Sequence, residues 1–190
     1  SELGCYLSHY GCVEKFLQTD ADYLVVLEDD LRIDNNFSST LQEILHYLHS
    51  QKNIEWSLIN IAAKKNKISR EIFRTHDYSL VRAYYFPIRG VGLVWSRQGA
   101  HDFLKMAQNP CLPVDIFFQN WLIKNGKGLS IWPPLVRPAG LDSDILGTVA
   151  TERVRRKQKE NRDFSFFMKK QLRLLKNNIL AYINFLSFKS

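Results

Sequence analysis

The chain contains few cysteines and no long apolar run. Its three cysteines form an odd count without zinc-type spacing, which argues against a disulfide framework and a zinc module. Cys5 and Cys12 lie on one expected helix, about 10.5 Å apart along its axis, too far for a disulfide. Cys111 has no evident partner, so we expect free thiols in a reducing compartment. No stretch is apolar over the length that spans a membrane.

Acidic residues are scarce near the C-terminus. Residues 1–150 contain 15 Lys and Arg against 16 Asp and Glu, whereas residues 151–190 contain 11 against three. The formal net charge of +7 therefore arises from the last segment. Basic charge confined to one segment does not indicate a nucleic-acid-binding domain, and we expect no nucleic-acid partner. We expect a folded domain over residues 1–148 and a basic tail over residues 149–190.

The most informative stretch is residues 23–30, an apolar run that ends in Glu28, Asp29 and Asp30. A short apolar run rich in β-branched residues predicts a buried strand, and open α/β sheets bind ligands at the carboxyl ends of their strands. Along a strand, Glu28 and Asp30 share one side, roughly 7 Å apart. Such a pair can hold one divalent cation, which offsets the repulsion between carboxylates. The alternative is a solvated strand end.

Helices and strands are expected to alternate along the chain. Periodicity and capping signals predict helices over residues 3–17, 40–49, 96–106 and 113–124. Thr40 and Glu43 have the spacing of a capping box, and Ser96 is an expected N-cap. Strands are expected over residues 56–62, 78–86, 92–95 and 129–132, with a basic loop over residues 64–74. This alternation predicts an α/β sandwich with a largely parallel sheet.

Three tryptophans and a second acidic pair need a separate interpretation. Trp95, Trp121 and Trp132 lie in apolar surroundings and are expected in the core, although an exposed tryptophan would suit a sugar ring. Asp142 and Asp144 follow no expected strand, so we place them in a loop and treat the pair as a false metal motif. They could still contact a donor or acceptor.

Acids at the end of a strand are typical of two classes of enzyme. Phosphoreceiver domains also need an aspartate at the end of a later strand, but here residues 57–61 run into Ala62, Ala63 and Lys64. Nucleotide-sugar transferases use such acids to hold Mn²⁺ or Mg²⁺ against the donor diphosphate. The cation meets the charge that develops on the departing diphosphate. The sequence therefore favours the second class.

Several motifs, in order, resemble those of glycosyltransferase family 25. The family patterns are GC-x-LSH, LEDD, G-x-G-x-x-x-SR-x-x-A, P-V/I-D, P-x-V/L and S-x-I. The similar segments here are residues 4–9 (GCYLSH), 27–30 (LEDD), 90–100 (GVGLVWSRQGA), 113–115 (PVD), 134–136 (PLV) and 143–145 (SDI). The likeness covers roughly residues 2–146.

The resemblance implies an inverting transfer of a sugar, with galactose expected, from a UDP-sugar to a bacterial lipopolysaccharide or lipooligosaccharide acceptor. Collagen galactosyltransferases are relatives of this family. A GT-A-like (Rossmann-like), mostly parallel sheet flanked by helices is implied, with Mn²⁺ or Mg²⁺ on Glu28 and Asp30. Members normally carry an upstream strand and helix that cradle the nucleotide, so we expect that the chain is truncated before Ser1.

Asp115 is the expected general base, which would take the proton of the attacking acceptor hydroxyl. Its place at a helix start would keep it ionised, although a capping acid is the alternative. The residues assigned to donor binding are His9, Glu28, Asp29, Asp30, Gly90 and Gly92. For His9 the alternative is a packed side chain, and for the two glycines it is a turn before a strand.

The basic tail has the pattern of an interfacial helix. Residues 153–162 are a charge run. Over residues 164–188, apolar residues alternate with Lys169, Lys170, Arg173 and Lys176, and those at helical spacing are Met168, Leu172, Leu175, Ile179, Tyr182 and Leu186. An anionic membrane surface is therefore the expected partner of residues 151–188, next to a lipid-linked oligosaccharide acceptor. We expect localisation at the cytoplasmic face of the inner membrane. The alternatives are a helix packed on the domain or paired in a homodimer. The non-enzyme alternative is an inactive, membrane-docked interaction module derived from a transferase.

Overall fold

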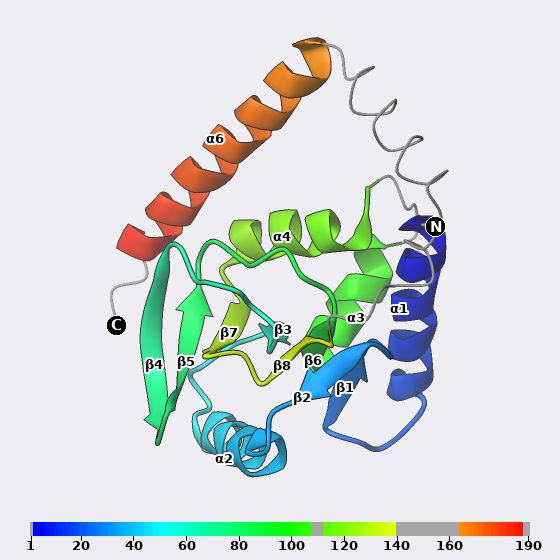
Figure 1. Cartoon of the computed structure of the whole chain (residues 1–190), viewed down its shortest axis with the longest axis vertical. Coiled ribbons are helices and arrows are strands. Elements are labelled where there is room, and N and C mark those ends of the chain that lie inside the picture. Colours follow the sequence, from blue (N-terminus) through cyan, green and yellow to red (C-terminus); the bar gives the residue numbers. More distant parts are fainter. Residues whose placement is uncertain (1, 108–111, 140–163, 188–190) are drawn as a thin grey trace.

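A six-stranded sheet forms the centre of the computed structural model, which describes residues 2–107, 112–139 and 164–187 (Figure 1). The spatial order of the strands in this described part is β1-β6-β3-β7-β5-β4. Their bounds are β1 (Tyr23–Leu27), β3 (Leu58–Asn60), β4 (Ser69–Thr75), β5 (Tyr78–Ala83), β6 (Gly92–Ser96) and β7 (Gly128–Trp132).

The sheet is mixed, so the prediction of a mostly parallel sheet was wrong. Among the described strands, β3 and β7 pair parallel and the other neighbours pair antiparallel. One cause is a hairpin between β4 and β5, in which Thr75 pairs with Tyr78. His76 lies in this turn with φ 39°. A two-residue loop joins antiparallel strands, because a parallel pair needs a long crossover.

Helices cover both faces of the sheet and bury two apolar clusters. Their bounds are α1 (Glu2–Leu17), α2 (Phe37–Ser50), α3 (Arg97–Met106) and α4 (Val114–Asn125). Leu93 and Trp95 pack with residues of α1, α3 and α4, whereas Val94, between them, packs with residues of α2. Successive side chains of a strand point to opposite faces, so one strand contributes to both clusters.

Two helix starts test the predicted capping signals. Ser96 caps α3 as expected, because its Oγ accepts a hydrogen bond from the Gly99 amide at 3.0 Å. The capping box at Thr40 was wrong, since α2 already begins at Phe37. Thr40 is buried within the helix, and Glu43 instead accepts a hydrogen bond from the Thr75 hydroxyl. The Glu43 side chain, which the local pattern assigned to a helix cap, therefore makes a tertiary contact with β4.

Three further expectations are corrected. Residues 64–74 are not all loop, because β4 begins at Ser69 and pairs with β5. The acidic motif does not follow a buried strand: β1 lies at the edge of the sheet in the described residues, and Val25 and Leu27 are each 37% exposed. Trp95 and Trp121 are buried, but Trp132 is 41% exposed. Trp132 therefore lies outside the core.

A small second sheet follows the acidic motif directly. Strand β2 (Leu31–Ile33) pairs antiparallel with β8 (Val136–Pro138). The amide of Ala139 also donates to the carbonyl of Asp30 at 2.8 Å. The chain thus turns at the three acids and enters another sheet, which fixes the backbone on the C-terminal side of the motif.

The last described element is the helix α6 (Phe164–Ser187), which packs beside α4 (Figure 1). Asn177 Nδ2 donates to Asn120 Oδ1 at 3.0 Å, and Asn184 Nδ2 donates to the Ile123 carbonyl at 2.6 Å. Ala181 is fully buried. One face of the predicted tail helix therefore lies against the domain. The charge run over residues 153–162, Cys111 and the pair Asp142 and Asp144 lie outside the described residues, as does the expected boundary near residue 148.

Candidate active site

A cleft of about 320 Å³ opens where β1 ends and α4 begins. It is lined by residues from four separate segments: Cys5, Glu28, Ile88, Arg89, Gly90, Val91, Pro113, Val114 and Asp115. The fold thus brings Glu28, Gly90 and Asp115 together, although they are far apart in the sequence. These are three of the residues that the sequence analysis selected.

Glu28 holds its place because its backbone extends the pairing of β1 by one step. The Glu28 amide donates to the Val91 carbonyl at 3.0 Å, across the cleft wall. Although the residue as a whole is exposed, the cleft removes water from its carboxyl. This burial raises the pKa of Glu28, and the neighbouring charges of Asp30 and Asp29 raise it further. The charges of Asp30 and Asp29 therefore reach the Glu28 carboxyl.

The predicted alternation of the acids does not apply, since β1 ends at Leu27 and the acids lie in a bend. Among the described residues, no three His, Cys, Asp or Glu side chains gather closely enough to hold a metal ion. Glu28 and Asp30 provide hard oxygen ligands and repel each other, which is the chemistry that a divalent cation offsets. The pair fits a cation whose shell is completed by other oxygens, such as donor phosphates.

Asp115 occupies the first turn of α4, as predicted. Its Oδ1 accepts a hydrogen bond from the Ile116 amide at 2.7 Å, so it satisfies one of the free N–H groups of the helix start. The carboxyls of Glu28 and Asp115 both raise the pKa of the Cys5 thiol, after the larger effect of burial. This agrees with the lining of the cleft, which includes Cys5, Glu28 and Asp115.

His9 lies behind this cleft rather than in it. The side chain is 4% exposed and meets the ring of Phe118 edge-on, with centroids 5.5 Å apart. Its Nδ1 has no hydrogen-bond partner among the described residues, and burial lowers its pKa to about 4. A Cβ added at Gly90 would lie 3.6 Å from His9 Nε2. The packed alternative describes His9 as it stands, and its role in donor binding stays a prediction.

The two glycines of the predicted donor site differ in their surroundings. Gly90 lines the cleft, and ordinary space remains beside it. Gly92 is buried in β6, where an added Cβ would lie 2.5 Å from Val136 Cγ2 and 3.0 Å from Ile61 Cγ1. A side chain at this position would overlap with Val136 and Ile61, which explains why the residue is a glycine. Whether either glycine binds a donor stays a prediction.

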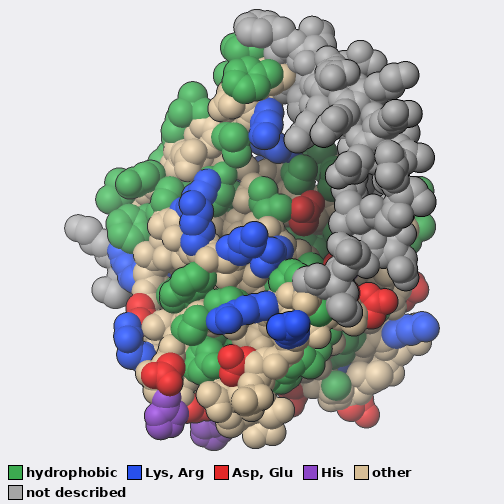
Figure 2. Space-filling view, in the orientation of Figure 1, with side chains coloured by type: hydrophobic (Ala, Val, Ile, Leu, Met, Phe, Trp, Pro, Cys, Tyr) green, Lys and Arg blue, Asp and Glu red, His purple; other side chains and the backbone are tan. Residues whose placement is uncertain are grey.

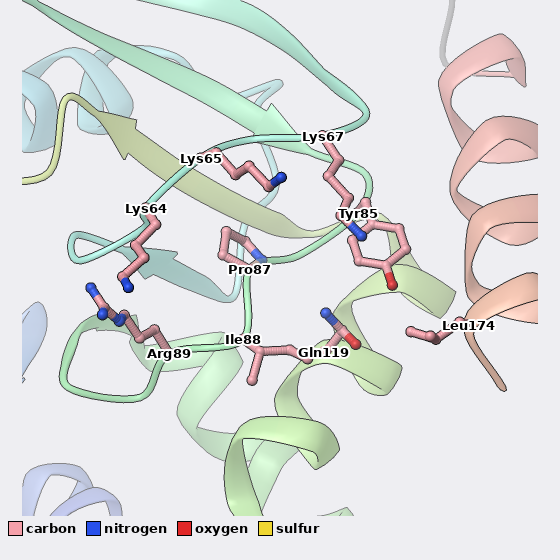
Figure 3. A pocket seen from close by; sticks show the side chains of 9 residues that line it. All are labelled: Lys64, Lys65, Lys67, Tyr85, Pro87, Ile88, Arg89, Gln119 and Leu174. Carbon is pink, nitrogen blue, oxygen red and sulfur yellow. The ribbon is translucent and has the colours of Figure 1, made fainter. Parts of the chain in front are cut away.

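A second pocket of about 230 Å³ adjoins the first and shares Ile88 and Arg89 with it. Figure 3 shows its other lining residues, which are Lys64, Lys65, Lys67, Tyr85, Pro87, Gln119 and Leu174. Lys and Arg side chains also gather over the middle of the face shown in Figure 2. The basic run between residues 64 and 67 was a visible signal in the sequence. Tyr85, Arg89 and Gln119 were missed, because only the fold brings them to the lysines.

Comparison with known proteins gives a family and several relatives. A family model described as glycosyltransferase family 25 (LPS biosynthesis protein) matches residues 1–118. Procollagen galactosyltransferase 1 of Danio rerio is 36% identical over 120 residues, which are 61% of this chain and 19% of that protein. Procollagen galactosyltransferase 2 of Homo sapiens is 31% identical over 120 residues, 61% of this chain and 18% of that protein.

A relative described as inactive also matches. The probable inactive glycosyltransferase 25 family member 3 of Bos taurus is 33% identical over 119 residues, which are 61% of this chain and 19% of that protein. The chain spans about a fifth of the length of these curated relatives. The residues that the family model matches include the acids at residues 28–30 and the start of α4, and thus both sides of the cleft.

Proposed function

Since the chain belongs to glycosyltransferase family 25, we propose that it takes part in an inverting transfer of a sugar from a UDP-sugar to an acceptor hydroxyl. Two of the named relatives are galactosyltransferases, which supports galactose as the sugar. The observation that carries the proposal is the cleft that joins Glu28 and Asp115. Both side chains line this cleft, and in the proposal Glu28 serves the cation while Asp115 takes the proton.

Asp115 is the proposed general base. A base must lie within hydrogen-bond reach of the hydroxyl whose proton it removes, and Asp115 lines the cleft from the helix start. Asp115 lies in the first turn of α4, and a carboxylate oxygen is a group that can accept a proton. The wall at Gly90 leaves backbone rather than a side chain beside the substrate. Glu28 and Asp30 would hold Mn²⁺ or Mg²⁺, which supplies charge stabilisation to the leaving diphosphate when bound.

The acceptor that we propose is a lipid-linked oligosaccharide of the lipopolysaccharide or lipooligosaccharide type, in line with the description of the family model. The named galactosyltransferases are described as acting on procollagen, which makes a collagen-like peptide the rival acceptor. Radioactive galactose transfer into each acceptor by the full-length gene product separates the two. Transfer into the peptide alone would overturn the lipid-linked assignment.

The donor site is tested by calorimetric titration of UDP into the full-length protein, with and without Mn²⁺. We expect binding that requires Mn²⁺ and that Asp30→Asn removes, because the variant loses one of two charged ligands for the cation. Asp22→Asn is the matched control, since Asp22 is an exposed acid at the opposite end of β1. No UDP binding by the wild type would contradict the transferase proposal.

A second candidate function is an inactive interaction module derived from a transferase. The relative described as probably inactive favours it, since that protein is 33% identical to this chain over 119 residues. The titration above separates the two candidates. A protein that fails to bind UDP in Mn²⁺ yet folds cooperatively would support the module.

We also propose that α6 rests on an anionic membrane surface at the cytoplasmic face of the inner membrane. The described helices include none that is long and apolar enough to cross a membrane. One side of α6, however, exposes large apolar side chains, visible along this helix in Figure 2. They are Phe167, Met168, Leu172, Leu175, Ile179, Tyr182, Ile183 and Leu186. The exposed Lys169 and Lys176 flank this face on the helix, and each cation near anionic headgroups contributes about 1 kcal/mol.

Co-sedimentation with vesicles tests the membrane proposal. We expect binding to vesicles that contain phosphatidylglycerol, weaker binding to phosphatidylcholine alone, and loss of binding in Leu172→Asp. Ile33→Asp is the control, because it makes the same kind of change at an exposed apolar residue far from α6. A buried leucine such as Leu48 would not serve, since its replacement would disrupt the core. Concentration-dependent dimers that Leu172→Asp abolishes, without vesicle binding, would instead support a homodimer through this face.

A further inference from the structure

The second pocket brings positive charge together near the buried hydroxyl of Tyr85. Lys64, Lys65, Lys67 and Arg89 line it, and Figure 3 shows Lys64 and Arg89 pointing toward one another. Like charges brought together repel, and a bound anion would offset this repulsion. Within the described part of the chain, both ion pairs lie elsewhere, between Arg74 and Glu71 and between Lys127 and Glu55. None of the four cations of the pocket belongs to either pair.

Tyr85 supplies an independent observation that points to a ligand. The residue is 4% exposed, and its hydroxyl has no hydrogen-bond partner among the described residues. Figure 3 shows this hydroxyl pointing toward the side of the pocket lined by Gln119 and Leu174. Leaving a buried polar group unpaired costs free energy, so a partner is expected from outside the chain. Lys67 Nζ lies 4.3 Å from the centroid of the Tyr85 ring and holds positive charge beside it.

The helix α6 adds a second unpaired donor near the same tyrosine. Arg173 Nε is buried and finds no hydrogen-bond partner within the described residues. The charge of Arg173 acts on Tyr85, where it lowers the pKa, although burial raises that pKa by more. The Tyr85 hydroxyl is therefore protonated at neutral pH and available as a donor. Tyr85 lines the pocket together with the lysines, so an oxygen of a phosphate group bound there would accept a hydrogen bond from its hydroxyl.

We propose that this basic pocket binds a phosphate group carried by the acceptor, beside the cleft in which the sugar is transferred. The assignment to the acceptor rests on the proposed function, which gives the donor diphosphate to the cation at Glu28 and Asp30. The pocket and the cleft share Ile88 and Arg89, so one ligand can occupy both. Ligand sites usually measure about 300–1,000 Å³, and the smaller pocket suits a single group of a larger molecule.

Direct binding of inorganic phosphate, followed by phosphorus NMR on the full-length protein, tests the pocket. We expect Tyr85→Phe to weaken phosphate binding about 10-fold, because the variant removes one hydrogen bond to a charged group. Lys64→Ala should weaken it as well, while Lys52→Ala should not, since Lys52 is an exposed lysine outside the pocket. Tyr85→Phe should also leave thermal stability unchanged or raised, because the hydroxyl has no partner in the described part of the chain. Equal phosphate binding by all these variants would overturn the pocket.

A second arm identifies the source of the phosphate. Phosphate affinity that is unchanged by saturating UDP and Mn²⁺ supports an acceptor subsite. Displacement of phosphate by UDP, together with weaker UDP binding in Tyr85→Phe, would overturn it in favour of the donor. A third outcome is phosphate binding that depends on Tyr85 in a protein that fails to bind UDP. This outcome would contradict the proposed function, and with it the assignment of the phosphate to an acceptor, but not the phosphate site itself.

Discussion

The acidic cleft and the basic pocket are neighbours with opposite charge. Glu28 and Asp115 line the cleft, and three lysines line the pocket. Ile88 and Arg89 line both cavities. The acidic side suits a cation and a proton, whereas the basic side suits an anion. The proposed transfer of a sugar from a donor to an acceptor would use both kinds of recognition at one place. Two neighbouring cavities that share Ile88 and Arg89 can therefore suit ligands of opposite charge.

The two sites also differ in how the chain builds them. The acidic cleft uses the ends of regular elements, since Glu28 follows β1 and Asp115 begins α4. The basic pocket uses the segment between β3 and β4, the segment after β5, and the helices α4 and α6. The first site therefore depends on the central sheet, and the second depends on how α6 packs.

Asp115→Asn should have the largest effect and should break the acidic side alone. The amide cannot accept the proton of the attacking hydroxyl, so we expect transferase activity to fall about 10²- to 10⁴-fold. UDP binding in Mn²⁺ and phosphate binding should both persist. Sugar transfer at saturating donor, measured with the two binding titrations, checks this prediction.

The control for that prediction is Asp102→Asn, in the neighbouring helix α3. Asp102 accepts a hydrogen bond from Gln98 at 2.8 Å and does not line the cleft. Its variant should retain near-normal activity. Asp115→Asn with activity close to the wild type would show that Asp115 serves α4 only as a capping acid.

His9, which is buried next to the cleft at Gly90, should make the free energy of unfolding depend on pH. Its pKa is about 4 in the fold, against 6.5 for the unperturbed side chain, because burial disfavours the charged form. The unfolded chain therefore binds a proton before the folded chain does, and the stabilisation that is present above pH 6.5 is lost as pH falls toward 4. This contribution reaches about 1.4 kcal/mol per pH unit within that window.

Urea denaturation of wild type and His9→Gln at pH 7 and pH 5 measures this dependence. We expect the difference in unfolding free energy between the two proteins to change by on the order of 2 kcal/mol across that interval. His101→Gln, at an exposed histidine of α3, should show no such change. A pH dependence that is the same in His9→Gln and wild type would mean that His9 remains solvated.

Much of this architecture was predictable, and the failures have physical causes. Local signals found α1, α3, α4 and the strand before the acids, because periodicity and capping are properties of neighbouring residues. The direction of pairing was missed, since it depends on contacts such as Thr75 with Tyr78 across a hairpin. Glu43 was misassigned for the same reason, because its partner lies in β4.

The candidate site shows the same limit. Glu28 was selected because it follows an expected strand and carries a charge, and Asp115 because it lies in a segment that resembles a family motif; their roles stay predictions. Tyr85 and Gln119 carry no such signal, since a tyrosine in an apolar run and a glutamine in a helix are ordinary core and surface residues. The Tyr85 hydroxyl stands out only in the fold, where it is buried without a partner among the described residues.

The two glycines sharpen the distinction between packing and access. Gly92→Ala should lower stability by about 1–3 kcal/mol, because the new methyl group would overlap with the buried Val136 and Ile61 side chains. Gly90→Ala should change stability little, since its Cβ meets His9 at an ordinary distance. It should instead narrow the cleft and weaken UDP binding. Thermal denaturation with UDP titration separates the two, and equal destabilisation would contradict the assigned difference.

The smallest expected effect tests whether α6 belongs to the basic side. Asn177→Ala removes the hydrogen bond to Asn120, a net contribution of about 0.5–1.5 kcal/mol. Because α6 supplies Leu174 to the pocket, a loosened helix should also weaken phosphate binding while leaving UDP binding unchanged. The exposed Gln171→Ala, on the same helix, is the control. Phosphate affinity that does not respond to Asn177→Ala, despite a measured loss of stability, would show that the pocket forms without the packing of α6 on α4.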